Sequence, residues 1–164
     1  MENAKILFCD LDGTLIDTLS GETFPKGVWD MRFKMDVWEA IKKHSPKYIL
    51  IATNQGGIES GFVNEDNFVS KMDYISVALK EYTGCDEVIY HYCPTNDKGN
   101  MDRKPNPRMY ISLFKSFESI YSKEDCLAIG DASGKPGQFS DSDKVAAERF
   151  GCRYMDVEDF LKDD

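Results

Sequence analysis

The sequence predicts an α/β fold built on a doubly wound, mainly parallel sheet flanked by helices. Short apolar runs of strand length alternate with amphipathic stretches, an order typical of βαβ units. One run, Tyr48-Ile-Leu-Ile-Ala52, is apolar throughout, as in strands that helices cover on both faces. The 164 residues, 41% of them hydrophobic, show no repeat, linker or low-complexity tract, so residues 1–164 are expected to form a single domain.

Each expected element follows from this alternation. The strands are the apolar runs, at residues 4–9, 48–52, 87–92, 126–129 and 153–155. The helices are the amphipathic stretches, at residues 35–44, 65–82, 107–117, 142–150 and 157–162. Pro107 suits the entry of the third helix, because proline is favoured at the first helical position. Since helical crossovers join successive strands, the strands should pair in parallel.

Composition restricts the class of protein. A formal net charge of −9 and a pI near 4.7 oppose broad binding to nucleic acid or to anionic membranes. The start lacks a basic segment followed by an apolar run, and no stretch is long and apolar enough for a membrane span. We therefore expect a soluble protein without membrane contact, cytoplasmic, or nuclear in a eukaryotic cell. The five scattered cysteines are expected to be buried free thiols, and the sequence leaves protein partners open.

The segment Cys9-Asp10-Leu11-Asp12-Gly13 places two carboxylates where a strand gives way to a glycine turn. Residues two apart on a strand point the same way, so the two carboxylates can converge at the ligand side of the sheet. Crowded carboxylates need a cation, and Mg²⁺ suits oxygen ligands and bridges to phosphate. One carboxylate could then attack phosphorus while the other serves as acid and base. The alternative is an ordinary surface turn.

Three further polar groups follow predicted strands. Thr53 and Asn54 precede a glycine pair and could bind phosphoryl oxygens, or form an ordinary turn. Arg103 and Lys104 precede a helix, where a fixed lysine would stabilise transferring charge, although such pairs are usually solvated. Asp131 follows the run Leu-Ala-Ile-Gly and could complete a cation site with Asp10, or cap a turn.

The order Asp-x-Asp-Gly-Thr, strand-Thr, Lys-Pro and strand-Gly-Asp resembles the haloacid-dehalogenase (HAD) superfamily of phosphotransferases over nearly the whole chain. The resemblance implies a Rossmann-like fold without a large cap domain and Mg²⁺ as cofactor. It makes Asp10 the nucleophile and Asp12 the general acid and base. It further implies phosphate binding by Thr53, Asn54 and Lys104, and metal binding by Asp10, Asp12 and Asp131. Asp143 corresponds to the second acid of the family's fourth motif, which begins at Gly130-Asp131. The resemblance implies that it positions the metal ligands without binding the metal itself.

Within that superfamily, finer features resemble the 3′-phosphatase domain of polynucleotide kinase/phosphatases. They are Ser20-Gly-Glu-Thr-Phe24-Pro25, Thr53-Asn-Gln-Gly-Gly-Ile58, Arg103-Lys-Pro and Gly130-Asp-Ala-Ser-Gly134. The resemblance implies removal of a 3′-phosphate from a DNA end, with Phe24 stacking on a base or sugar and Arg103 holding a neighbouring phosphate. No Gly-x-x-x-x-Gly-Lys-[Ser/Thr] run accompanies it, so no kinase is expected in this chain.

Other readings stay open. The pairing of Cys93-Pro94 with Arg103-Lys-Pro also resembles histidinol-phosphate and heptose-bisphosphate phosphatases, although only Cys93 of their zinc cluster is present. A small-metabolite phosphatase is therefore the second hypothesis. A receiver-like domain or a noncatalytic sensor of strand ends is a third, which Asp12 disfavours because a receiver needs no leaving-group acid. Contact with DNA would rely on a local patch of cations: Lys26, Arg32, Arg103, Arg108 and Lys135.

Overall fold

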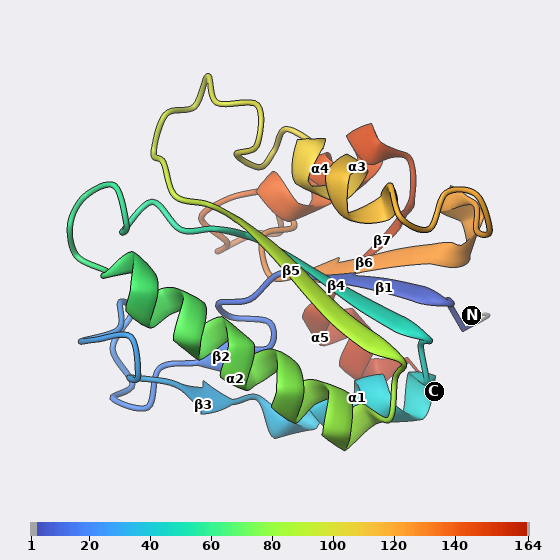
Figure 1. The fold of residues 1–164 in the computed structure, drawn as a ribbon, viewed down its shortest axis with the longest axis horizontal. Helices are drawn as coiled ribbons and strands as arrows, with labels where there is room; N and C mark the ends of the chain where they lie inside the picture. The colour runs from blue at the N-terminus through green and yellow to red at the C-terminus, as the bar shows by residue number, and fades with distance from the viewer. Residues whose placement is uncertain (1–2, 164) are drawn as a thin grey trace.

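The computed structural model describes residues 3–163, and their main sheet has five parallel strands (Figure 1). The strands are β1 (Ile6–Cys9), β4 (Tyr48–Asn54), β5 (Glu87–Cys93), β6 (Cys126–Gly130) and β7 (Arg153–Asp156), arranged in the order β5-β4-β1-β6-β7. Cys9 pairs with Ile51 on one side and with Ile129 on the other. The first strand of the chain is thus central, and its carboxyl end lies level with those of its two neighbours.

Helices cover both faces of this sheet (Figure 1). The core on one face includes α1 (Met35–His44), α2 (Glu65–Thr83) and α5 (Val157–Lys162), and the core on the other includes α3 (Arg108–Phe114) and α4 (Ser142–Phe150). Along β1, Leu7 and Cys9 face the first set of helices, whereas Ile6 and Phe8 face the second. This two-residue alternation is what a strand buried on both faces requires.

The predicted fold class is therefore confirmed, with differences at the ends of elements. Four strands run one or two residues further than predicted, β1 begins two residues later, and α3 is shorter than the expected 107–117. The sequence prediction missed β2 (Ile16–Asp17), β3 (Arg32–Phe33) and the 3₁₀ turn η1 (Lys123–Asp125). Strands of two residues are too short to show a period, so their antiparallel pairing could not be read from the pattern.

The loops that follow the strands gather at one edge of the sheet. The β1–α1 connection contains β2 and β3, and further loops follow β4, β5 and β6 (Figure 1). Asn64 ends the β4–α2 loop by capping α2, since its side chain accepts a hydrogen bond from Asn67 N at 3.0 Å. Among residues 3–163 we find no helix with the length and apolarity that crossing a membrane demands.

Candidate active site

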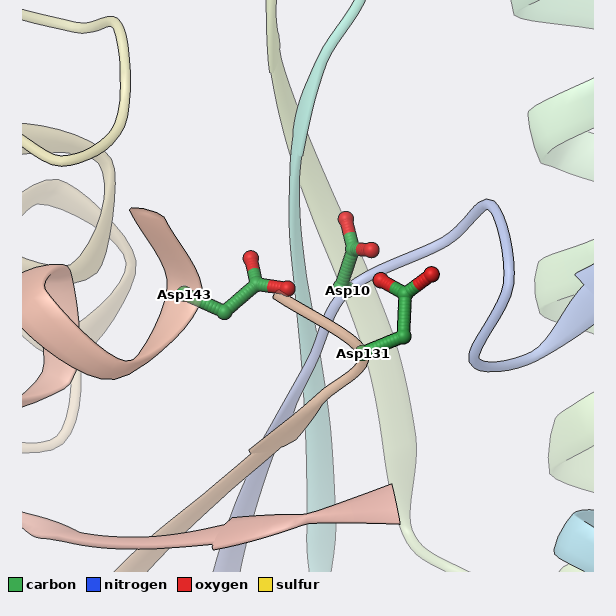
Figure 2. A group of neighbouring side chains, drawn as sticks. All are labelled: Asp10, Asp131 and Asp143. Atoms are coloured by element: carbon green, nitrogen blue, oxygen red, sulfur yellow. The ribbon is translucent and has the colours of Figure 1, made fainter. Parts of the chain in front are cut away.

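Three carboxylates from three parts of the chain converge at the carboxyl end of the sheet (Figure 2). Asp10 follows β1, Asp131 follows β6, and Asp143 lies in the first turn of α4. One oxygen from each lies within 4.8 Å of the other two. Within residues 3–163 this is the only group of acidic, histidine or cysteine side chains that could hold a metal ion. Its donors are all oxygens, which suits a hard cation such as Mg²⁺.

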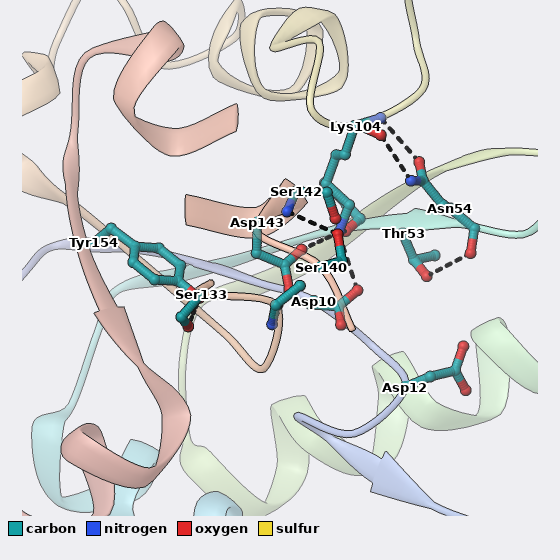
Figure 3. A network of polar contacts seen from close by, with 12 residues as sticks. Asp10, Asp12, Thr53, Asn54, Lys104, Ser133, Ser140, Ser142, Asp143 and Tyr154 are labelled. Carbon is teal, nitrogen blue, oxygen red and sulfur yellow. Dashed lines mark hydrogen bonds and ion pairs between the residues drawn. The ribbon is translucent and has the colours of Figure 1, made fainter. Parts of the chain in front are cut away.

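The ammonium of Lys104 is buried against two of these carboxylates (Figure 3). Its Nζ lies 3.0 Å from Asp10 Oδ1 and 2.6 Å from Asp143 Oδ1, and it also donates to Ala52 O at 2.8 Å. These three acceptors use all the N–H donors of an ammonium. Lys104 therefore fixes the two carboxylates, and a bond to a phosphoryl oxygen would require it to release one acceptor.

Asn54, the last residue of β4, holds the backbone of Lys104 in the loop before α3 (Figure 3). Its Nδ2 donates to Lys104 O at 3.0 Å, and its Oδ1 accepts from Lys104 N at 3.0 Å. The following peptide bond, Lys104–Pro105, is cis. Asn54 therefore positions Lys104, while the second N–H of its Nδ2 is still available to a phosphoryl oxygen.

Burial raises the pKa values of the three clustered carboxylates. It raises the pKa of Asp10 to about 7, against the lowering effect of Lys104. It raises the pKa of Asp143 to about 6, and the neighbouring charge of Asp10 adds to that shift. Burial also raises the pKa of Asp131. Three carboxylates share one ammonium, so a bound divalent cation would balance the remaining charge and favour their ionised forms.

Asp12 lies apart from Asp10 and Asp143 (Figure 3), and it does not belong to the three-carboxylate group. β1 ends at Cys9, so Asp10 and Asp12 both follow the strand, and the two-residue alternation expected from the sequence does not extend to them. Gln55 Nε2 instead donates to Asp12 Oδ2 at 2.8 Å. The geometry thus favours Asp143 over the side chain of Asp12 as the third carboxylate of a metal site, and it leaves one oxygen of Asp12 available for a proton.

Donors for a phosphoryl group remain beside Asp10. Thr53 lies two residues beyond Ile51, the partner of Cys9, so it is level with the turn that follows β1. Its hydroxyl is buried and donates to Asn54 O only at 3.5 Å, the outer limit of a hydrogen bond. In the chain between residues 3 and 163, the backbone N–H groups of Leu11 and Asp12 meet no acceptor. These donors could form an oxyanion site.

Two glycines allow the carboxylates to approach the backbone. A Cβ on Gly13, whose φ is +80°, would overlap the carboxylate of Asp131. A Cβ on Gly130 would lie 2.5 Å from Asp143 Oδ2, although the φ of Gly130 is not positive. Both sequence motifs therefore contain glycine for a steric reason, which is the close packing of acids from other segments.

The two expected substrate contacts lie outside this cluster. Phe24 is 81% exposed in the loop between β2 and β3. Arg103 is half-buried and donates through Nη1 to Thr95 O at 3.0 Å, within its own loop. The other expected cations each form an exposed ion pair with an acid of this chain: Lys26 with Glu22, Arg32 with Asp17, Arg108 with Asp102 and Lys135 with Asp159.

Two residues shape the site beyond the predicted site residues: Gln55, which the sequence placed only within the motif after β4, and Lys34, which it did not indicate. Gln55 joins Asp12 to Thr53, because its Nε2 also donates to Thr53 Oγ1 at 2.9 Å. Its position two residues after Thr53, at a strand end, was the available signal. Lys34 donates through Nζ to Gly13 O at 3.1 Å. Since Lys34 follows the two-residue strand β3, nothing in the local pattern could have indicated that contact.

Comparison with known proteins agrees with this geometry. A family model described as polynucleotide kinase 3 phosphatase matches residues 5–161. The uncharacterized 20.8 kDa protein in the FGF-VUBI intergenic region of Autographa californica nuclear polyhedrosis virus is 31% identical, over 98% of this chain and 87% of its own. The bifunctional polynucleotide phosphatase/kinase of Schizosaccharomyces pombe is 28% identical over 96% of this chain, which spans 37% of that protein.

A solved structure extends the comparison to phosphatases of small molecules. The crystal structure of D,D-heptose 1,7-bisphosphate phosphatase from B. bronchiseptica, complexed with magnesium and phosphate, superposes with a TM-score of 0.71. The two sequences are 25% identical, and the match covers 92% of this chain and 78% of that chain. The same fold therefore carries a magnesium and phosphate site in a related protein.

Proposed function

The chain belongs to the polynucleotide kinase 3 phosphatase family and is a phosphatase of the HAD type, and we propose that it removes the 3′-phosphate from a DNA end in a magnesium-dependent reaction. The observation that carries this proposal is the convergence of Asp10, Asp131 and Asp143, with Lys104 bound to the first and the last of them and a further acid at Asp12. A cation site, a fixed nucleophile and a separate proton donor are what phosphomonoester hydrolysis through a covalent intermediate needs.

In the proposed reaction, Asp10 attacks the phosphorus atom and forms an aspartyl-phosphate, while the bond to the leaving oxygen breaks. Asp12 gives its proton to that oxygen and later takes one from the water that hydrolyses the intermediate. The contacts support this division, since Lys104 holds the carboxylate of Asp10 and Gln55 orients that of Asp12. Asp12, outside the three-carboxylate group, is the better placed of the two to exchange a proton.

The phosphoryl oxygens would be held by Thr53 and by the backbone amides of the turn after β1. Asn54 positions Lys104, whose charge stabilises the transferring group without a direct bond. Asp10, Asp131 and Asp143 would hold Mg²⁺, which supplies neutralisation of charge and polarisation of the phosphate when bound. The residues fit that ion, because they are closely spaced oxygen donors with too little cationic charge of their own.

Two observations support DNA as the substrate. The family model spans 157 residues, from 5 to 161, and its description names polynucleotide. Loops at the active edge of the sheet also expose aromatic side chains, with Phe24, Phe62 and Phe139 each more than 80% exposed. Exposed rings that border a phosphate site could stack on unpaired bases at a strand end.

The β5–α3 loop further distinguishes this chain from zinc-containing phosphatases of metabolites. Hydrogen bonds hold the loop: Arg103 Nη1 donates to Thr95 O, and Asn106 Nδ2 donates to Asn100 O, each at 3.0 Å. The Sγ of Cys93 has only weak contacts, to Thr95 O and Asn100 Oδ1. The loop thus has internal support where a zinc cluster would otherwise be needed.

The proposal is tested by magnesium-dependent phosphate release from a short 3′-phosphorylated DNA. The same DNA with a 5′-phosphate, histidinol phosphate and heptose 1,7-bisphosphate serve as competing substrates, and Asp10→Asn is the inactive control. We expect kcat/KM to be highest for the 3′-phosphate. A higher kcat/KM for the 5′-phosphate would contradict the strand-end assignment.

A phosphatase of small metabolites is the second candidate. The ion pairs that engage Lys26, Arg32, Arg108 and Lys135 favour it, because a DNA backbone would have to compete for those cations. These pairs are exposed, so each stabilises the fold only weakly. Efficient turnover of heptose 1,7-bisphosphate or histidinol phosphate alone would establish this candidate in place of the first.

A further inference from the structure

One residue, Ala132, joins two of the three clustered carboxylates. It directly follows Asp131, and its N donates to Asp143 Oδ2 at 3.1 Å. Its carbonyl oxygen accepts from Asp143 N, also at 3.1 Å, and the residue is 4% exposed. The spacing of the carboxylates of Asp131 and Asp143 therefore depends on how the backbone at Ala132 is held.

The next residue, Ser133, is held through both its backbone and its side chain. Its N donates to Gln138 Oε1 at 2.8 Å. Its Oγ donates to Asp156 Oδ2 at 2.6 Å and lies 2.6 Å from Tyr154 OH (Figure 3). Ser133 is itself buried. These contacts fix the backbone immediately after Ala132.

Gln138 ties this segment to the end of β7. Its Nε2 donates to Asp156 Oδ2 at 2.8 Å. Its Oε1 accepts from Ser133 N and, at 3.2 Å, from Lys135 N. One side chain thus joins two backbone N–H groups of the segment to a carboxylate outside it.

Asp156 is a fixed anchor for these bonds. It is the last residue of β7, it pairs with Gly130 in the sheet, and it is 4% exposed. Its other oxygen, Oδ1, accepts from Glu158 N at 2.9 Å and so caps α5. Because the sheet holds its backbone and α5 holds its carboxylate, a group bound to Asp156 has a defined position.

The rest of the segment has little support of its own. Residues 134–137 and Phe139 are exposed, whereas Gln138 is half-buried. Gly134 N donates to Ser140 O at 3.1 Å, which closes the base of the loop. An exposed segment with few contacts opens easily, so loss of the Gln138 contacts should free the backbone at Ser133.

We propose that Gln138 positions Asp131 and Asp143 for a divalent cation, through the backbone of residues 132 and 133. This inference rests on the proposed magnesium site and adds a positioning residue to it. Groups that orient metal ligands without touching the metal typically change metal affinity by about tenfold to a hundredfold. Gln138 occupies such a place, because two steps of hydrogen bonding separate it from Asp143.

The test measures the Kd of Mg²⁺ by isothermal titration calorimetry, which needs no turnover. Gln138→Glu keeps the size of the side chain and an oxygen for Ser133 N, but it sets a carboxylate oxygen against Asp156 Oδ2 where Nε2 now donates. Repulsion should displace the side chain and raise the Kd about tenfold. Asn67→Asp, which adds the same charge at an exposed position of α2, should leave the Kd unchanged.

A second substitution tests the contact itself. In the double variant Gln138→Glu with Asp156→Asn, the new amide at position 156 can donate to the new carboxylate at position 138 and still cap α5 through its oxygen. Asp156→Asn alone sets two amide donors against each other and should weaken Mg²⁺ binding as well. The double variant should recover most of the affinity that each single variant loses. Absence of any recovery would overturn the inference.

Turnover and stability distinguish positioning from a purely structural role. In Gln138→Glu, excess Mg²⁺ should restore most of kcat, because the ligands are present but poorly spaced. Gln138→Ala, which removes the contacts without adding charge, should also raise the Kd of Mg²⁺. A lower Tm in both variants with an unchanged Kd would overturn the inference, since Gln138 would then support only the loop.

The calorimetric readout separates this inference from the proposed function. If the chain binds Mg²⁺ but hydrolyses none of the phosphomonoesters, the proposed function fails, and a weaker Kd in Gln138→Glu still supports the role of Gln138. If turnover has the same Mg²⁺ dependence in Gln138→Glu as in the unmodified chain, the role of Gln138 alone is overturned. Absence of Mg²⁺ binding by the unmodified chain would overturn both.

Discussion

Asn54 and Lys104 exchange two hydrogen bonds, one from the Asn54 amide to Lys104 O and one from Lys104 N to the same amide, each 3.0 Å long. This pair joins the end of β4 to the loop before α3, fifty residues away along the chain. Because the side chain of Lys104 also reaches back to Ala52 of β4, the lysine is fixed at both its backbone and its ammonium. The position of Asp10 therefore depends on a contact outside the carboxylate cluster.

Asn54→Asp is expected to lower kcat while changing KM little. The substitution replaces the Nδ2 donor with a second oxygen, which leaves Lys104 O without its partner and places a new charge beside the cluster. Loss of a buried hydrogen-bond partner costs about 1–3 kcal/mol, so thermal unfolding should also shift downward. Steady-state kinetics and a Tm measurement check both effects.

Asn67→Asp is the matched control, since Asn67 is exposed in the first turn of α2, where a negative charge is tolerated. If Asn54→Asp raised KM and left kcat intact, Asn54 would contact the substrate, as the sequence first suggested, and the positioning role would be rejected.

Asp12→Asn should impair substrates with poor leaving groups more than those with good ones. An alkyl phosphate needs protonation of its leaving oxygen, whereas an activated aryl phosphate leaves largely without it. The ratio of kcat for p-nitrophenyl phosphate to kcat for a 3′-phosphorylated nucleotide should therefore rise about tenfold or more. Asp10→Asn should abolish turnover of both substrates. Equal losses on the two substrates in Asp12→Asn would remove the general-acid role.

Gly130→Ala should disrupt the cluster by steric overlap alone. The added Cβ would lie 2.5 Å from Asp143 Oδ2, so that carboxylate must move away from Lys104. Overpacking of this kind costs about 1–3 kcal/mol, and we expect a similar loss of unfolding free energy together with a reduced kcat. Gly27→Ala is the control, because nothing lies within 4 Å of a Cβ there. Full activity in Gly130→Ala would show that Asp143 can shift without consequence.

The parallel sheet could be predicted because its strands are long apolar runs that two helical layers cover, so local pattern and burial agree. Asp10, Lys104 and Asp131 could be placed at one edge for the same reason, since each follows a predicted strand or precedes a helix. The spacing of Asp10 and Asp12 does not by itself separate their roles, and only the family resemblance assigned them. In the structure, the end of β1 at Cys9 and the contact of Asp12 with Gln55 distinguish the two side chains.

Asp143 shows a second limit of sequence reasoning. The family resemblance placed it behind the metal ligands. Eleven residues separate it from Asp131, and no local rule fixes where such a loop returns. In the structure Ala132 N donates to Asp143 Oδ2 at 3.1 Å, which brings α4 back to the strand end.

Magnesium affinity is expected to fall as the pH is lowered from 8 to 6. Burial raises the pKa of Asp10 to about 7 and that of Asp143 to about 6, so protons compete with the cation over this range. Isothermal titration calorimetry at the two pH values measures the change. Asp131→Asn should weaken binding more than Asp12→Asn does, because only Asp131 belongs to the three-carboxylate group. The reverse order would return Asp12 to the metal ligands.

Stability should fall below neutral pH because His44 is buried in its neutral form. Its Nε2 accepts a hydrogen bond from Ala4 N at 2.8 Å, which a protonated ring cannot do. Burial lowers the pKa of His44 from its usual 6.5, and the charge of Arg153 acts in the same direction. The unfolded chain therefore binds a proton at a higher pH than the folded one. The contribution is full above about pH 6.5 and is lost as the pH falls towards the folded pKa.

His44→Gln tests this origin, because glutamine can accept the same hydrogen bond but does not titrate. Urea unfolding at pH 7.5 and pH 5.5 should show a smaller loss of free energy in His44→Gln than in the unmodified chain. The carboxylates of the active site titrate in both proteins, so their effect cancels in the comparison. His91→Gln, which replaces an exposed histidine on β5, should keep the original pH dependence. The same dependence in all three proteins would mean that groups other than His44 govern it.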